Sequence, residues 1–154
     1  MHLPKLNFPE ITFRFKENKN GGKQIFDCIR KKFVDLTPEE WVRQNLIRYL
    51  IDEKKVPTSL IAVEKQLLLN GTKRRTDIVV YNSTLTPILI VECKAPSISL
   101  NQSTINQALA YNMVLTVPFI ILSNGLLHIC IKYDNEKATL LKEIFSFDEM
   151  LNSL

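Results

Sequence analysis

Residues 75–94, RTDIVVYNSTLTPILIVECK, decide the fold. Their two ends, 75–81 and 88–94, are rich in β-branched residues, and the turn-forming sequence Asn82-Ser-Thr separates them. The pattern predicts two neighbouring strands. The second contains the wholly apolar run Ile88-Leu-Ile-Val91, which is typical of a strand buried on both faces at the centre of a sheet.

Three charged residues interrupt these two apolar strands. Asp77 stands just before residues 78–80, and Glu92 and Lys94 end the second strand. Because side chains two residues apart on a strand point to the same face, Glu92 and Lys94 project together while Cys93 points the other way. If the two strands are neighbours in a hairpin, two carboxylates and one ammonium group converge on one site.

Such a cluster suits a metal ion. Neighbouring carboxylates raise each other's pKa unless a cation lies between them, and a hard divalent ion such as Mg²⁺ takes oxygen ligands of this kind. The metal lowers the pKa of a bound water and stabilises the leaving oxygen of a phosphodiester, while a lysine positions or helps to deprotonate that water. The alternative is that Asp77, Glu92 and Lys94 form a solvated ion pair at the strand ends, since most matches to so short a motif are accidental.

The rest of the chain predicts one α/β domain. Thr37-Pro-Glu-Glu40 starts a helix that we expect to run to about Lys54, with Thr37 as its cap and Glu40 completing a capping box. A second helix is expected over residues 101–115. Strands are predicted at 11–16, 24–29, 60–69, 118–122 and 126–133, the first two as an N-terminal hairpin, with a short terminal helix within 143–151.

Length and composition exclude several classes of protein. The 154 residues carry 20 Lys and Arg against 16 Asp and Glu, a net charge of +4, and 45% are hydrophobic, as in a globular domain. Neither of the glycine-rich phosphate-binding motifs, Gly-x-x-x-x-Gly-Lys-Ser/Thr and Gly-x-Gly-x-x-Gly, occurs in the sequence, so we expect no nucleotide cofactor. No apolar stretch is long enough to cross a bilayer, no secretory signal is visible, and the three cysteines have no disulfide or zinc spacing. These features predict a cytoplasmic protein that binds no membrane.

The order of the motifs resembles that of a known family. Asp77 followed by Glu92-Cys93-Lys94 is similar to the PD-(D/E)xK nuclease signature, with Thr76 in place of the proline. The wider pattern resembles the N-terminal nuclease domain of type I restriction enzyme R subunits over about residues 26–133. The segments that carry this resemblance are Thr37-Pro-Glu-Glu-Trp-Val-Arg-Gln44, Thr76-Asp-Ile-Val-Val80, Val91-Glu-Cys-Lys-Ala-Pro96 and Gln107-x-x-x-Tyr111.

This resemblance implies a restriction-endonuclease-like α/β fold, with a central mixed β-sheet flanked by helices and, here, an N-terminal β-hairpin. We expect a single domain over residues 1–154, comprising a hairpin extension at 1–35, a core at about 37–133 and a C-terminal extension at 134–154.

The resemblance also implies the roles of five residues. Asp77 and Glu92 would bind the metal, and Lys94 would be the catalytic lysine. Gln107 and Tyr111, four residues apart and therefore on one helical face, would contact the substrate phosphate or orient Lys94. Taken alone, Gln107 and Tyr111 would suggest only a pair on a helix surface.

Two further acidic residues are candidate metal ligands. Glu40 matches the position where this fold often supplies another acidic group, although capping already explains Glu39 or Glu40. Glu64, on the strand at 60–69, ranks below it.

Basic residues lie on the turn that leads into Asp77, and a second basic cluster occupies residues 30–32. Both are candidates for contacts with nucleic-acid phosphates, although charge runs are usually solvated surfaces. The residues of the first cluster are Lys73, Arg74 and Arg75.

Together these features predict a Mg²⁺-dependent endonuclease that hydrolyses DNA phosphodiester bonds, with Mn²⁺ as a substitute metal. Nucleases of this fold also act on RNA or on branched DNA. Cutting both strands often needs two active sites, so a homodimer or other restriction-system subunits are expected partners. The alternative is a non-catalytic nucleic-acid-binding or assembly module that retains the fold, because 154 residues cannot hold the ATP-driven motor of an R subunit.

Overall fold

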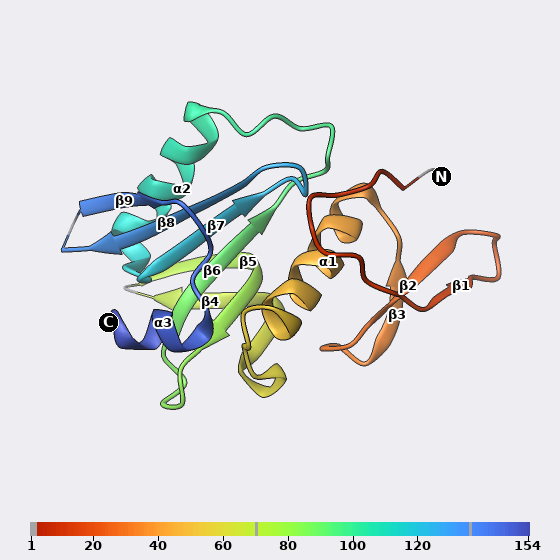
Figure 1. Ribbon diagram of the computed structural model, residues 1–154, viewed down its shortest axis with the longest axis horizontal. Coiled ribbons are helices and arrows are strands. Elements are labelled where there is room, and N and C mark those ends of the chain that lie inside the picture. Colours follow the sequence, from red (N-terminus) through yellow and green to blue (C-terminus); the bar gives the residue numbers. More distant parts are fainter. Residues whose placement is uncertain (1–2, 70, 136) are drawn as a thin grey trace.

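The computed structural model describes residues 3–69, 71–135 and 137–154 (Figure 1). Its main sheet has six strands in the order β4-β5-β6-β7-β8-β9. β6 and β7 are parallel, and the other neighbours are antiparallel. The strands are β4 (Ile61–Leu69), β5 (Thr72–Tyr81), β6 (Pro87–Cys93), β7 (Phe119–Ser123), β8 (His128–Asp134) and β9 (Lys137–Leu141).

Helices cover both faces of this mixed sheet (Figure 1). α1 (Pro38–Asp52) and α3 (Phe147–Asn152) share one hydrophobic core with the sheet, and α2 (Gln102–Leu115) shares a second core with the opposite face. α2 also supplies the crossover that the parallel pair β6 and β7 requires. β6 is buried on both faces, as its apolar sequence predicts.

A second, smaller sheet lies beside α1, on the side away from the main sheet (Figure 1). Its strands β1 (Phe15–Glu17), β2 (Lys23–Asp27) and β3 (Lys32–Asp35) are antiparallel in the order β1-β2-β3. The predicted N-terminal hairpin is therefore present, but a third strand extends it. The first strand also begins later than predicted, at Phe15 instead of Ile11.

Most element bounds agree with the predictions to within a few residues. α1 begins after its cap Thr37, whose hydroxyl accepts a hydrogen bond from the Glu40 backbone N–H at 3.0 Å. The predicted capping box is wrong, because arginines bind the Glu40 carboxylate instead. A short 3₁₀ helix, Thr58–Leu60, precedes β4, and β9 is a strand that the sequence did not predict. Within the described ranges, no helix has both the length and the apolar character to span a membrane.

The pairing of β4 and β5 is distorted at one position. The register pairs Val63 with Ile78 and Lys65 with Thr76, and between them Glu64, which stands opposite Asp77, adopts a φ of 51°. A left-handed backbone is uncommon for a residue other than glycine. Strict alternation would put Arg74 and Ile78 on one face, yet Ile78 packs in the core shared with α1 and Arg74 lines a pocket beside α2. β5 therefore exchanges its faces at Asp77.

Candidate functional site

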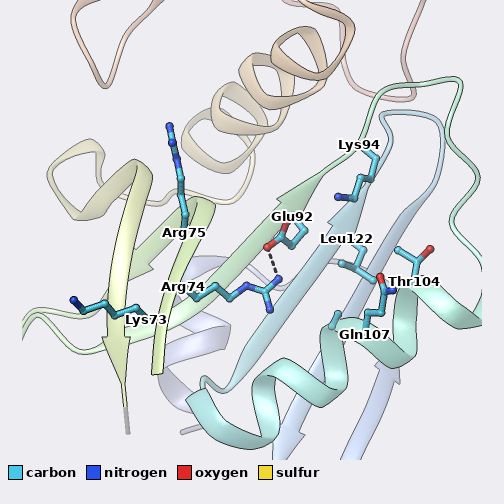
Figure 2. A pocket seen from close by; sticks show the side chains of 9 residues that line it. Lys73, Arg74, Arg75, Glu92, Lys94, Thr104, Gln107 and Leu122 are labelled. Carbon is cyan, nitrogen blue, oxygen red and sulfur yellow. Dashed lines mark hydrogen bonds and ion pairs between the residues drawn. The ribbon is translucent and has the colours of Figure 1, made fainter. Parts of the chain in front are cut away.

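A pocket of about 500 Å³ lies between the ends of β5, β6 and β7 and the first half of α2 (Figure 2). Three of the five residues predicted to be catalytic line this pocket: Glu92, Lys94 and Gln107. All three residues predicted to bind nucleic acid line it as well: Lys73, Arg74 and Arg75. The remaining lining residues are Thr104, Ala108 and Leu122.

Glu92 and Lys94 lie on the same side of β6, as alternation predicts. Both line the pocket, whereas Cys93 between them is buried in the core shared with α1. Burial raises the pKa of the Cys93 thiol well above its usual value, so this cysteine is a packing residue and not a thiolate nucleophile. The backbone N–H of Lys94 donates to the Ser123 carbonyl at 2.8 Å, which fixes the start of the segment after β6.

Arg74 forms an ion pair with Glu92 at the centre of the pocket. Its Nη2 donates to Glu92 Oε1 at 2.5 Å, and both side chains are more than four-fifths buried, with 13% and 18% exposed. Figure 2 shows the Arg74 side chain reaching to Glu92, whereas Lys73 and Arg75 extend away from it. Arg75 instead contacts Glu64, at 3.0 Å.

Asp77 lies on β5, next to β6, and its carboxylate is held from two sides. Oδ2 accepts a hydrogen bond from the Cys93 backbone N–H at 2.7 Å, and Oδ1 accepts one from Arg43 Nη2 at 2.7 Å. The bond to Cys93 ties Asp77 to the backbone between Glu92 and Lys94. The structure therefore places both predicted carboxylates at adjoining strands, each with an arginine bound to it.

Glu40 lies in a buried network of charges on α1. Its Oε1 accepts hydrogen bonds from Arg30 at 2.6 Å and from Gln44 at 2.8 Å, and its Oε2 accepts one from Arg43 at 2.5 Å. Only 8% of the Glu40 side chain is exposed. Both of its carboxylate oxygens are thus engaged by α1 and by the loop after β2, just as both oxygens of Asp77 are engaged by Arg43 and Cys93.

Glu39 of α1 contacts Arg43 at 3.5 Å and lies within electrostatic range of the candidate site. Burial raises its pKa, as does the negative charge of Asp77 and, more weakly, of Glu92; the positive charges of Arg43 and Lys94 act in the opposite direction. These influences place Glu39 in the field of Asp77, Glu92 and Lys94. From the sequence, Glu39 was interpreted only as a capping residue. Neighbouring positions on a helix differ by about 100°, and the sequence pattern does not show which of the two glutamates faces a sheet.

Glu64 belongs to the same buried network as Glu40. Its carboxylate accepts a hydrogen bond from Arg30 at 2.8 Å and contacts Arg75 at 3.0 Å. Arg30 also binds Asp27 at the end of β2, at 2.6 Å. Salt bridges therefore run without interruption from the small sheet, through Arg30, Glu40 and Arg43, to Asp77.

Gln107 and Tyr111 both lie on α2, one turn apart. Gln107 lines the pocket and is exposed, while the side chain of Tyr111 lies outside the described residues. Thr104, one turn before Gln107, also lines the pocket and was not predicted. Thr104 lies three residues before Gln107 near the capped start of α2, and residues three apart share a helical face. This spacing could have identified it from the sequence.

The donors at this site fit a hard divalent cation. Among the residues that the structure describes, no group of three or more His, Cys, Asp and Glu side chains is arranged to hold a metal ion. Mg²⁺ needs fewer protein ligands, because it retains several waters and is usually bound through one or two carboxylates and substrate phosphates. Asp77 and Glu92 supply such carboxylates, and Glu39 adds negative charge nearby.

Comparisons with known proteins identify the same family that the motifs resemble. The sequence model described as Type I restriction enzyme R protein N terminus (HSDR_N) matches residues 38–145. A fragment structure described as the HsdR subunit of a type I restriction enzyme from Vibrio vulnificus YJ016 matches with a TM-score of 0.58 and 19% sequence identity. That match covers 76% of this chain and 25% of that chain, so this chain spans about a quarter of the fragment's length. A comparison with curated proteins gives no match.

The structural match shows the fold, which is restriction-endonuclease-like: a mixed sheet flanked by helices, with a small antiparallel sheet at the N-terminus. The family match extends over α1, the main sheet and α2, and so contains every residue predicted for the site. Because this match covers well over half of the sequence, the chain belongs to the family of type I restriction enzyme R protein N-terminal regions.

Proposed function

We propose that this chain is a metal-dependent endonuclease domain that hydrolyses phosphodiester bonds of DNA. The observation that carries the proposal is that Glu92, Lys94 and Gln107 line one pocket, with Asp77 tied to the backbone beside them. Membership in a restriction-enzyme family supports DNA as the substrate and other subunits of a restriction system as partners.

Asp77 and Glu92 would hold the metal, Mg²⁺ or its substitute Mn²⁺. When bound, the metal supplies an activated water and neutralises charge on the phosphate. Lys94 brings its ammonium group to the same pocket, where it orients the water and stabilises charge that develops on a phosphoryl oxygen. Gln107 donates an amide hydrogen bond to the phosphate from the helix side, with Tyr111 proposed as its neighbour in this role.

Arg74 gives the site a resting state. Its guanidinium neutralises Glu92 in this structure, at 2.5 Å, and so takes the place of a cation. A guanidinium also binds phosphate oxygens strongly, through charge-assisted hydrogen bonds. DNA that enters the pocket thus offers Arg74 a phosphate acceptor in place of Glu92, and the transfer of Arg74 to the phosphate frees Glu92 for the metal.

Cleavage of supercoiled plasmid tests the proposal. The parent protein is expected to nick the plasmid with Mg²⁺ or Mn²⁺ and not with EDTA. Lys94→Ala is expected to lower the rate by about 10²-fold or more, the usual contribution of a general acid–base group. The matched control is Lys137→Ala, which removes an exposed lysine from β9 and should cleave at the parent rate. If Lys94→Ala cleaves as fast as the control, the assignment of Lys94 is wrong.

One observation favours a second candidate function. Both proposed metal ligands are paired with arginines here, Asp77 with Arg43 and Glu92 with Arg74. A non-catalytic nucleic-acid-binding or assembly module would keep those pairs permanently. It predicts DNA binding without turnover, no Mn²⁺ binding detectable by titration calorimetry, and DNA affinity that survives Asp77→Ala.

A further inference from the structure

The positive charge of this protein is concentrated in the small sheet. Residues 12–35 contain seven Lys and Arg and three Asp and Glu, a net charge of +4, which equals the net charge of the whole chain. The remaining residues therefore sum to zero. Asp27 and Arg30 of this segment are paired with each other. The excess positive charge therefore belongs to the other charged residues of the segment.

Two of these cations are held on aromatic rings. The Arg14 guanidinium lies 4.5 Å from the centre of the Phe26 ring, and Lys16 Nζ lies 4.5 Å from the centre of the Phe33 ring. The two rings contact each other edge to face, with centroids 5.2 Å apart. Arg14 and Lys16 are exposed, whereas the rings beneath them are half-buried. Stacking fixes the positions of both charges and reduces the entropy that they would lose on binding a ligand.

The cluster lies on the face of the small sheet opposite Phe15 and Asp27, and at one edge Arg14 and Phe26 also border a small cavity with Gln44 and Arg48 of α1. Phe26 and Phe33 are register partners, and strand alternation puts Lys16 on their face. Residues of the opposite face are directed at α1: Phe15 contacts Trp41, and Asp27 accepts a hydrogen bond from Gln44 at 2.8 Å. Arg14 and Lys16 are therefore exposed charges on a sheet that these contacts anchor to α1.

This sheet is connected to the candidate site, yet it lies outside the family match, which begins at residue 38. Arg30, just after β2, binds Glu40 at 2.6 Å and Glu64 at 2.8 Å, and Arg43 continues the network to Asp77. The four charged or aromatic residues of the cluster, Arg14, Lys16, Phe26 and Phe33, have no part in the proposed chemistry.

We propose that this cluster is a second DNA contact, which binds the phosphate backbone of duplex DNA outside the cleavage site. The proposal rests on DNA being the substrate. Because the cations cover the two rings, the surface offers charge and not a stacking platform for bases, so it binds phosphates without regard to sequence. The cluster adds affinity for DNA that the cleavage site cannot supply, because the acidic residues of that site offset its cations.

The test is the salt dependence of binding to a labelled duplex, measured by fluorescence anisotropy in EDTA so that no cleavage occurs. Each phosphate contact contributes about 0.9 to the slope of log K against log salt concentration. The double variant Arg14→Gln, Lys16→Gln keeps two polar side chains and is expected to lower the slope by about 1.8. Lys16→Gln alone, which leaves Arg14 on Phe26, should lower it by about 0.9.

The matched control is Lys137→Gln, Lys142→Gln, which removes the same charge from exposed positions on and after β9. It should leave the slope unchanged. Three results would each overturn the proposal. The slope of the Arg14→Gln, Lys16→Gln variant could equal that of the parent, both double variants could lower the slope equally, or the parent could fail to bind duplex DNA at low salt. Failure of the proposed function can be distinguished from failure of this proposal. If the slopes are as expected but the protein does not cleave plasmid, the second DNA contact is supported and the proposed nuclease activity is wrong.

Discussion

Arg74 and Glu92 show how one residue pair sets the state of the pocket. An arginine paired at 2.5 Å with a carboxylate that is less than one-fifth exposed competes directly with any metal for that carboxylate. Its positive charge also repels a divalent ion nearby. The proposed binding of a metal to Glu92 would therefore include the free energy of separating this pair.

Arg74→Ala is accordingly expected to strengthen Mn²⁺ binding in the absence of DNA. Ion pairs at exposed sites contribute up to about 1 kcal/mol, so separating this largely buried pair corresponds to a Kd at least about fivefold lower without it. Titration calorimetry with Mn²⁺ measures it. Arg75→Ala is the matched control on the same strand, because Arg75 is largely exposed and binds Glu64 instead. Weaker Mn²⁺ binding by Arg74→Ala would show that Arg74 does not oppose the metal.

At the level of the residue, the sequence predicted which side chains lie together in the pocket, but not how they pair with one another. The pattern of Glu92, Cys93 and Lys94 was sufficient to predict which side chains share a face, because alternation on a strand is fixed by the backbone. The role of Arg43 was not predictable. A basic residue on an amphipathic helix is usually solvated, and here it is buried because β4 and β5 place Glu64 and Asp77 against it.

The small sheet and α1 are joined by Asp27, which is fully buried. Burial alone would raise its pKa, but hydrogen bonds from the Arg30 backbone and guanidinium and from Gln44 outweigh it and hold the pKa below the usual 3.8. A lowered acid pKa contributes stability that is fully present above the unfolded value and is lost as the pH falls through the folded value.

Asp27→Asn should therefore lower the free energy of unfolding by about 3 kcal/mol at pH 7, the cost of breaking a buried charge pair. The difference from the parent should shrink as the pH falls below 3.8. Urea unfolding at pH 7 and pH 3 measures both. Asp35→Asn, at an exposed site on β3, is the control and should cost less than about 0.5 kcal/mol. A difference that stays constant with pH would rule out the ionised carboxylate as its cause.

The end of α2 contains a strained residue. Thr116 caps the helix with a φ of 54°, a left-handed conformation that disfavours β-branched side chains and favours glycine. Thr116→Gly is expected to stabilise the protein by about 1 kcal/mol and to raise Tm by about 2–4 °C. Thr116→Ala retains a Cβ and should gain much less. Equal gains from Gly and Ala in thermal unfolding would contradict the strain.

At the level of the elements, long periodic segments were predicted and short charged ones were not. α1, α2 and β6 followed from their apolar spacing. β3 begins within the basic run 30–32, and β9 is a short, mostly exposed strand, so neither has the apolar pattern that identifies a strand. The exchange of faces in β5 was also hidden, because it depends on the backbone of Glu64 in the neighbouring strand.

In the whole molecule, α1 lies between two sheets, and its surroundings explain why it carries both apolar and charged buried residues (Figure 1). Val42, Leu46 and Leu50 pack against the main sheet, while Glu40 and Gln44 bond to residues of the small sheet, Arg30 in the turn between β2 and β3 and Asp27 at the end of β2. The arrangement connects the proposed DNA contact on one side of α1 with the proposed cleavage site on the other.

Asp77 and Glu92 are proposed to bind a metal that supports DNA cleavage. The most direct test of this proposal is nicking of supercoiled plasmid by the parent and by Glu92→Gln, with Mg²⁺, Mn²⁺ or EDTA. We expect metal-dependent nicking by the parent, none in EDTA, and a loss of at least about 10²-fold in Glu92→Gln. Equal nicking by the parent and by Glu92→Gln, or nicking that persists in EDTA, would contradict it.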